Sequence, residues 1–225
     1  AQTMVDIGKL AGKPVVAVIT SMAQPLGTHI GNALEVKDAI DVLAGRTQGD
    51  LLEISLLLGS HMLVLAEKAK TLPEARAMLE NALSSGAGLR KLAEMIAAQG
   101  GDPRVVEDLS LLPQAAVKCV MRAETAGYLS AMDTTALGMA AQRMGAGRAK
   151  KSDMLDYSVG YVLHVRLGDE VTEDTPLATL YARNEAEAEE AEKAIRKALT
   201  IAKEKPQTPK LWDAVVTAEG ITYNR

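Results

Sequence analysis

The sequence predicts an α/β protein whose first part is mainly helical and whose second part is rich in short strands. Two observations support this prediction. Apolar residues recur with helical spacing through most of the first half, and from about Pro113 short β-type runs alternate with glycines. The change in pattern indicates two domains, residues 1–126 and 127–225, and 225 residues allow each domain a core of its own.

The chain is expected to open with an amphipathic helix followed by one strand. AQTMVDIG has helical spacing from its first residue, without an initiating Met or an N-cap residue. We therefore expect the chain to be the back part of a longer protein. After Gly12-Lys13-Pro14, the run Val15–Thr20 is continuously apolar and β-branched, which predicts a strand buried on both faces.

Capping patterns predict the next helix starts. Asn32 followed by Glu35 has the spacing of a capping box and predicts a helix over Ala33–Leu43. Thr71 followed by Glu74 repeats the pattern and predicts a helix to about Leu83.

Between these helices, Asp50–Lys70 predicts a core-facing helix. Its predicted buried stripe consists of Leu51, Ile54, Leu58, Met62 and Leu65. After a break at Gly86–Gly88, a further helix is expected over Leu89–Gln99, closed by the turn residues Gly100 to Pro103.

The second part is predicted to combine short strands with two helices. The expected strands are Ala115–Ala123, Gly127–Met132, Gly160–Val165 and Leu177–Tyr181. Thr135–Met144 and Glu185–Lys203 are expected to be helical, with the acidic run Glu185–Glu192 on a solvated face.

Composition narrows the functional class. The net charge is −4, and the aromatic residues are one Trp and five Tyr, which counts against a nucleic-acid partner. No long uncharged apolar run and no signal-like N-terminus are present, so we expect a soluble cytoplasmic protein without membrane association. Cys119 is the only cysteine, which excludes an intramolecular disulfide and fits a reducing compartment.

Four stretches carry a family resemblance. They are QPLGTHIGNALEVKD at Gln24–Asp38, SGAGLRKLAEMIAAQGGDP at Ser85–Pro103, ETAGYLSAMDTTALG at Glu124–Gly138, and the stretch from GAGR to GDEV and beyond at Gly145–Ala182. In this order they resemble the pyrimidine-nucleoside phosphorylase and thymidine phosphorylase family. The resemblance implies the back part of a phosphorylase α/β domain with a mixed sheet in residues 1–126. It implies a strand-rich α/β-hammerhead, or barrel-sandwich-like, C-terminal domain in residues 127–225.

Gly168–Ala182 is also similar to the barrel-sandwich element of biotinyl and lipoyl carrier domains. A carrier needs a lysine at its hairpin tip, and no lysine occurs between Lys151 and Lys193. We therefore expect no carrier function.

The family resemblance implies a pentosyltransferase. The parent enzyme would transfer the pentosyl group of thymidine or uridine to phosphate, its co-substrate, giving free base and (deoxy)ribose 1-phosphate, and would be a homodimer. The family's glycine-rich K-x-S loop, its G-G-T phosphate motif and its pyrimidine-clamping residues are not found in this sequence. We therefore expect no catalytic or substrate-binding residue in the chain, and no activity from the chain alone.

The Gln24–Asp38 segment is the candidate cation site. A glycine-containing loop that frees carbonyls, followed by a helix with a carboxylate, can surround a hard cation with oxygen ligands. The resemblance implies a structural potassium ion held by the carbonyls of Leu26 and His29 and the carboxylate of Asp38. Family members often have Glu at the position of Asp38, and an Asp at that of Ser21. Without the resemblance, Glu35 and Asp38 are ordinary acids near a helix N-terminus, which its dipole favours.

The remaining polar features receive structural interpretations. His61 and His164 have no triad-like partner nearby in the sequence, so neither is assigned a catalytic role, and His164 should face the less buried side of its strand. Gly145–Lys151 lacks Walker spacing and is expected to be a surface loop that docks the second domain on the first.

Two other functional classes remain open from the sequence. One is a stand-alone structural or binding domain. The other is a related phosphorolytic or phosphoribosyl-transferring enzyme that acts on another base.

Overall fold

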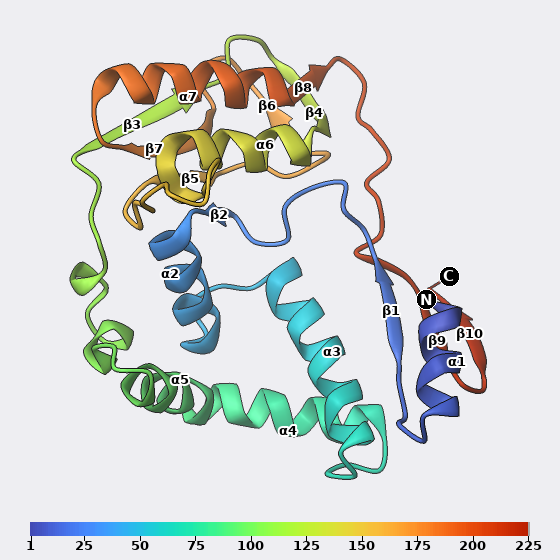
Figure 1. The fold of residues 1–225 in the computed structure, drawn as a ribbon. Coiled ribbons are helices and arrows are strands. Elements are labelled where there is room, and N and C mark those ends of the chain that lie inside the picture. The colour runs from blue at the N-terminus through green and yellow to red at the C-terminus, as the bar shows by residue number, and fades with distance from the viewer. Residues whose placement is uncertain (225) are drawn as a thin grey trace. The chain divides into compact units, whose positions relative to one another are not determined.

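The structure is a computed structural model in which residues 1–224 are described (Figure 1). The α-helices are α1 (Gln2–Leu10), α2 (Asn32–Leu43), α3 (Asp50–Leu65), α4 (Leu72–Ser84), α5 (Ala87–Ala98), α6 (Thr134–Ala141) and α7 (Glu185–Ala198). Short 3₁₀ turns η1 (Pro103–Val106) and η2 (Leu109–Leu111) follow α5, and the π-helical turn η3 (Gln142–Ala146) follows α6. None of the described helices combines the length and apolar character that a membrane span needs.

The strands form three antiparallel sheets. The strands are β1 (Ala17–Thr20), β2 (His29–Ile30), β3 (Val117–Arg122), β4 (Gly127–Met132), β5 (Gly160–Leu163), β6 (Glu170–Val171), β7 (Pro176–Ala182), β8 (Leu199–Ala202), β9 (Trp212–Thr217) and β10 (Gly220–Tyr223). Their orders are β1-β9-β10, β2-β5-β7-β3 and β6-β4-β8. The α/β class is therefore confirmed. The mixed sheet is a wrong expectation for residues 1–224, where every pairing between strands is antiparallel.

The chain divides into two compact units, each built from separated segments. Unit 1 contains 1–21, 42–90 and 209–225, and unit 2 contains 22–41 and 91–208. Unit 1 therefore includes α1, α3, α4 and the β1-β9-β10 sheet, whereas unit 2 includes the other two sheets together with α6 and α7. The chain passes between the units within α2 and within α5.

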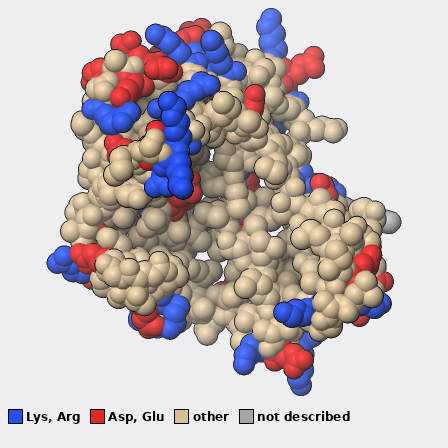
Figure 2. All heavy atoms as spheres, viewed as in Figure 1, with Lys and Arg blue, Asp and Glu red and all other residues tan. Residues whose placement is uncertain are grey.

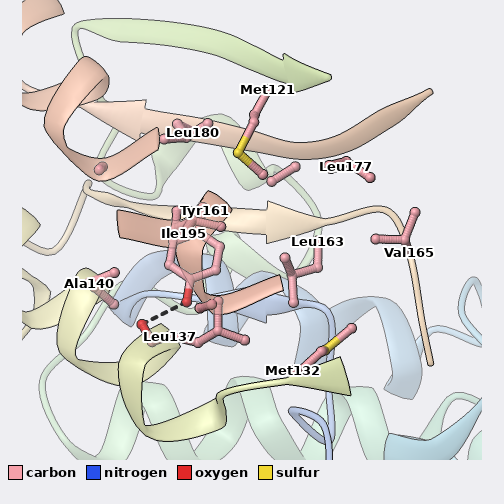
Figure 3. Close-up of a cluster of buried hydrophobic side chains, with 14 of the residues drawn as sticks. Met121, Met132, Leu137, Ala140, Tyr161, Leu163, Val165, Leu177, Leu180 and Ile195 are labelled. Carbon is pink, nitrogen blue, oxygen red and sulfur yellow. Dashed lines mark hydrogen bonds between the residues drawn. The ribbon is translucent and has the colours of Figure 1, made fainter. Parts of the chain in front are cut away.

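Unit 2 has a continuous apolar core. In Figure 3, the Tyr161 side chain of β5 points toward Leu137 of α6. Both belong to one cluster with Leu163 of β5 and with Leu177 and Leu180 of β7, and all five are almost fully buried. The Tyr161 hydroxyl donates a hydrogen bond of 2.7 Å to the Leu137 carbonyl, which satisfies the polar end of the ring. Helices α6 and α7 pack together, and α7 lies along β7 and β3.

A side-chain cap fixes the start of α7, and the burial along this helix confirms the predicted polar face. The side chain of Asn184 caps α7 by accepting from the Glu187 N–H at 3.0 Å. Ala188, Ala191 and Ile195 are buried at helical spacing, so the acids between them lie on the solvated face as predicted. The helix ends at Ala198, earlier than the expected Lys203, because Leu199–Ala202 pairs with β4 as strand β8.

The helical part of unit 1 packs around a smaller cluster. Leu52 and Leu56 of α3 contact Val42, and Leu79 and Leu83 of α4 pack against them. The start of α4 confirms the predicted cap at Thr71, since the Glu74 N–H donates to Thr71 Oγ1 at 3.3 Å. The reciprocal half of the box is shifted by one residue, because Glu74 Oε2 accepts from the Lys70 N–H at 2.8 Å.

The expected buried face of α3 is confirmed at Ile54, which is buried, but is wrong at Leu58 and Met62. Leu58 is 41% exposed and Met62 is 68% exposed, whereas Leu52, Leu56 and Ser60 are buried. Helix α3 is apolar around most of its circumference, so periodicity cannot choose a face. The choice follows from packing: Leu79 of α4 comes so close to Gly59 that a Cβ there would lie 2.9 Å from its Cδ1.

Strand β1 forms where it was predicted but is not buried on both faces. It pairs with β9 from Ala17 to Thr20, and Ile19 and Thr20 are exposed. Strands β9 and β10, which form the rest of this sheet, were not predicted from the sequence.

Candidate functional site

The candidate cation segment is held in unit 2 by a short backbone crossing. Strand β2 pairs with β5, His29 opposite Val162 and Ile30 opposite Tyr161. Gly31 and Gly160 pack directly at this crossing, with φ values of +135° and +146°. A Cβ on Gly160 would lie 2.1 Å from the Ile30 carbonyl oxygen, so only glycine permits this approach. Helix α2 begins at Asn32, directly after this crossing, so the crossing fixes the start of the helix that carries Asp38.

Carbonyl groups of the preceding loop converge on a cationic side chain. Arg166 Nη1 donates to the Pro25 carbonyl at 2.7 Å and approaches the Gly27 carbonyl at 3.4 Å, and Nη2 approaches the Leu26 carbonyl at 3.4 Å. The Gln24 side-chain oxygen accepts from the Leu167 N–H at 2.9 Å. The loop thus presents several backbone oxygens to a positive charge.

His29 and Asp38 come together through the imidazole ring. His29 Nδ1 lies 3.5 Å from Asp38 Oδ1 and 3.0 Å from Thr28 Oγ1, and His29 Nε2 lies 3.3 Å from Lys37 Nζ. Asp38 is 4% exposed, which is unusual for a carboxylate. The structure therefore brings two of the three predicted site residues into contact.

Burial lowers the pKa of His29, so the imidazole is neutral at pH 7. Lys37 and His164 lower this pKa further, while Asp38 and Asp41 oppose the shift. Because the Lys37 ammonium can only donate, Nε2 accepts and the ring proton belongs on Nδ1, facing Thr28 and Asp38. This tautomer assignment follows from the hydrogen-bond pattern.

The donor chemistry suits a hard monovalent cation in part. A carboxylate offers about four acceptor directions. The contact of Asp38 with His29 uses one of them, so the carboxylate can still bind a cation. The Leu26 carbonyl faces the Arg166 guanidinium, so a cation would share this oxygen with Arg166. Among residues 1–224, no group of three or more His, Cys, Asp and Glu side chains is placed to hold a metal ion, which leaves backbone oxygens as the other ligands.

Asn32 and Glu35 do not form the capping box that the sequence predicts. The Glu35 N–H donates to the Gly31 carbonyl at 2.8 Å, and the Asn32 side chain donates to the Ala146 carbonyl at 2.8 Å. Glu35 still reaches back, accepting from the Gly31 N–H at 3.4 Å. Asn32 is drawn away to the end of η3, a contact between residues 114 apart that sequence spacing cannot show.

The other histidines and the cysteine occupy structural positions. His164 faces the exposed side of its segment, as predicted, and its Nε2 lies 2.7 Å from Thr179 Oγ1. Burial lowers the pKa of His61, whose Nε2 is buried without a hydrogen-bond partner, and it also lowers that of His164. Cys119 is a free, half-buried thiol whose pKa is raised by burial.

Two residues of this site were missed from the sequence. Arg166 collects the loop carbonyls, and Lys37 contacts the His29 ring. Alternation along Tyr161–Leu167 places Arg166 on the same side as His164, away from the buried side chains, and this was the available signal. Lys37 carried no signal, because a lysine on a helix is ordinarily a solvated residue.

Comparison with known protein families gives two matches in succession. Residues 1–89 match the model of the glycosyl transferase family a/b domain. Residues 128–202 match the model of the pyrimidine nucleoside phosphorylase C-terminal domain.

Curated relatives agree with this order. Pyrimidine-nucleoside phosphorylases of Geobacillus stearothermophilus and Bacillus subtilis are each 49% identical over 185 residues, which is 82% of this chain and 43% of the relative. The enzyme of Staphylococcus aureus strain USA300 is 43% identical over 202 residues, 90% of this chain and 46% of the relative. The chain thus spans less than half the length of these relatives. Its two matched domains and its identity to these enzymes show that the chain belongs to the pyrimidine-nucleoside phosphorylase family.

Proposed function

We propose that this chain acts as the C-terminal part of a pyrimidine-nucleoside phosphorylase. The parent enzyme would transfer the pentosyl group of thymidine or uridine to phosphate, releasing free base and (deoxy)ribose 1-phosphate. The observation that carries the proposal is the succession of the two family domains, together with 43–49% identity to enzymes of that name. We also propose that the parent is a cytoplasmic homodimer. The single cysteine of this chain, Cys119, is a free thiol, which fits a reducing compartment.

The domain division belongs to the same proposal. Residues 1–126 would be the back part of the phosphorylase α/β domain, and residues 127–225 the C-terminal domain with a hammerhead or barrel-sandwich-like plan. The match over residues 128–202 supports this boundary. The Gly168-Asp169 turn of the proposed barrel-sandwich element lies between β5 and β6, and the Arg166 N–H donates to Asp169 Oδ2 there at 2.7 Å.

Leu26, His29 and Asp38 are proposed to hold a structural potassium ion in this enzyme. The buried Asp38 carboxylate and the Leu26 and His29 carbonyls would supply hard oxygen ligands. A bound potassium ion would add fixed positive charge beside the loop and order it. The roles of this chain's own residues are to bind that ion and to hold the loop: Gly31 and Gly160 fix the crossing, and Arg166 orders the carbonyls.

The test of the enzyme proposal is a phosphorolysis assay with thymidine and uridine. The chain alone would be compared with a chimera in which the N-terminal part of the Geobacillus enzyme precedes it. We expect no base release from the chain alone and release from the chimera. Turnover by the chain alone would mean that catalytic groups lie within these 225 residues, and an inactive, folded chimera would contradict the proposal.

The test of the cation proposal uses the same chimera. Asp38→Asn should raise the potassium concentration needed for half-maximal activity by about tenfold, since one charge-assisted ligand is lost. Asp41→Asn is the matched control, because Asp41 is one turn along α2 and lies 3.4 Å from Lys37 rather than at the proposed ion. Equal potassium dependence in both variants would reject the ion site while leaving the phosphorylase proposal intact.

A further inference from the structure

A pocket of about 340 Å³ opens on unit 2 beside α2. All of its lining residues belong to unit 2 and come from α2, from the 109–115 segment, from the turn before β5, and from β3 and β7. The lining residues are Ala33, Leu34, Lys37, Leu109, Ser110, Leu112, Pro113, Gln114, Ala115, Lys118, Ser158 and Tyr181. The volume lies within the range of small-molecule sites, about 300–1,000 Å³.

The charged residues that line this pocket are both lysines. Lys37 Nζ is positioned 3.3 Å from His29 Nε2 and 3.4 Å from Asp41 Oδ2. Lys118 Nζ lies over the Tyr181 ring, 5.6 Å from its centroid. Each ammonium group has three N–H donors, so these contacts leave donors for a ligand.

The positive charge of Lys118 acts on the nearby His164. After burial, the charge of Lys118 is the second cause that lowers the pKa of His164. No Asp or Glu is among the described residues that line the pocket, and the Asp41 carboxylate beside Lys37 lies outside the lining. Acidic and basic side chains are interspersed over the face seen in Figure 2. The pocket differs from that surface, because its charged lining residues are both lysines.

The two serine hydroxyls in the lining have committed their protons. Ser110 Oγ donates to Asp108 Oδ1 and Ser158 Oγ donates to Asp156 Oδ1, both at 2.6 Å. Their oxygen lone pairs remain able to accept hydrogen bonds, for which the hydroxyl groups of a sugar are suitable donors. The Asp108 and Asp156 carboxylates also accept the backbone N–H groups of Ser110 and Ser158, so these two acids are engaged in their own turns.

The rest of the wall is apolar. Leu34, Leu109, Leu112 and Pro113 form it together with alanines. Such a surface favours a flat ring, and sites of this kind pair an apolar wall with a few placed polar groups. Cations, hydroxyl acceptors and an apolar wall therefore occur together in one pocket.

We propose that this pocket binds a nucleoside monophosphate, with its phosphate at Lys37 and Lys118, its sugar hydroxyls at Ser110 and Ser158, and its base against Leu112 and Pro113. This inference goes beyond the proposed function and does not depend on it. A ligand here would join α2 to β3 and the 109–115 segment, all parts of unit 2.

Titration of the ¹⁵N-labelled chain with adenosine monophosphate (AMP), adenosine or inorganic phosphate, followed by NMR, tests the proposal. Adenosine compounds are chosen so that binding is not confused with a pyrimidine-nucleoside substrate. We expect AMP to shift the amides of Ala33, Lys37, Ala115 and Lys118. Adenosine and phosphate should each bind at least about tenfold more weakly, because each lacks one part of the recognised group.

Two lysine variants test whether the positive charge of Lys118 binds the phosphate group of AMP. Lys118→Gln should weaken AMP binding by about tenfold and leave adenosine binding unchanged. Lys68→Gln is the control, since it makes the same charge change at an exposed lysine of unit 1. The proposal is overturned if AMP shifts none of these amides in a chain with a folded spectrum, if adenosine or phosphate binds as tightly as AMP, or if Lys68→Gln weakens AMP as much as Lys118→Gln.

Discussion

The two units of the chain bury apolar side chains to very different degrees. In unit 2, Met121, Leu129, Tyr161, Leu180 and Ile195 are completely buried within one cluster. In unit 1, a smaller cluster is centred on Leu52 and Leu56, Val5 and Val216 are buried elsewhere, and large apolar side chains such as Leu10 and Met62 remain mostly exposed. Unit 2 therefore has the larger continuous apolar core, and the candidate cation segment and the pocket beside α2 both lie in this unit.

The two units also differ in what packs against their glycines. In unit 2, Gly31 and Gly160 allow two backbones to touch, and their positive φ values exclude most other residues. In unit 1, Gly59 makes room for the Leu79 side chain of α4. A side chain can move aside at low cost whereas a backbone cannot, so the unit 2 crossing is the more sensitive of the two.

The largest expected effect compares leucines of the two cores. Leu180→Ala should lower the free energy of unfolding by about 4 kcal/mol, because the close-packed surroundings cannot fill the cavity. Leu52→Ala should cost about 2 kcal/mol, since the smaller cluster in unit 1 can relax. Urea unfolding followed by circular dichroism measures both, and equal losses would contradict the contrast between the units.

A slightly smaller effect is expected at the β2–β5 crossing. Gly160→Ala should destabilise the chain by about 3 kcal/mol, because the new Cβ meets the Ile30 carbonyl at a strained φ. Gly138→Ala is the matched control: no atom lies within 4 Å of its added Cβ, and in the exposed helix position the change should stabilise by about 0.5–1 kcal/mol. Thermal unfolding distinguishes them, and a stable Gly160→Ala variant would show that the crossing can shift.

The smallest effect concerns pH. The folded pKa of His61 is lowered by burial, so below about pH 6.5 the unfolded chain binds more protons than the folded chain. The stability that neutral His61 provides is therefore complete above pH 6.5 and falls as the pH drops toward the folded pKa. His61→Leu should flatten this decline between pH 7 and pH 5.5, measured by urea unfolding at each pH. An unchanged slope would assign the acid sensitivity to His29 and His164 of unit 2, whose pKa values are lowered in the same direction.

Local signals in the sequence determined much of this protein. Capping chemistry placed the start of α4 at Thr71, a short β-type run after a glycine placed β4, and alternation placed the exposed side of His164. The order of the motifs along the chain indicated the family. These features depend on neighbours within a few residues along the chain, or on the succession of short motifs, so the sequence by itself contains them.

Tertiary structure decided what depends on distant residues. Packing by α4 chose the buried face of the uniformly apolar α3, and pairing with β4 turned the end of the predicted Glu185–Lys203 helix into β8. Asn32 left its expected capping role for the Ala146 carbonyl, and Arg166 reached loop carbonyls about 140 residues away in the sequence. Such contacts carry no local pattern, because the energy of burial and hydrogen bonding depends on which segments the fold brings together.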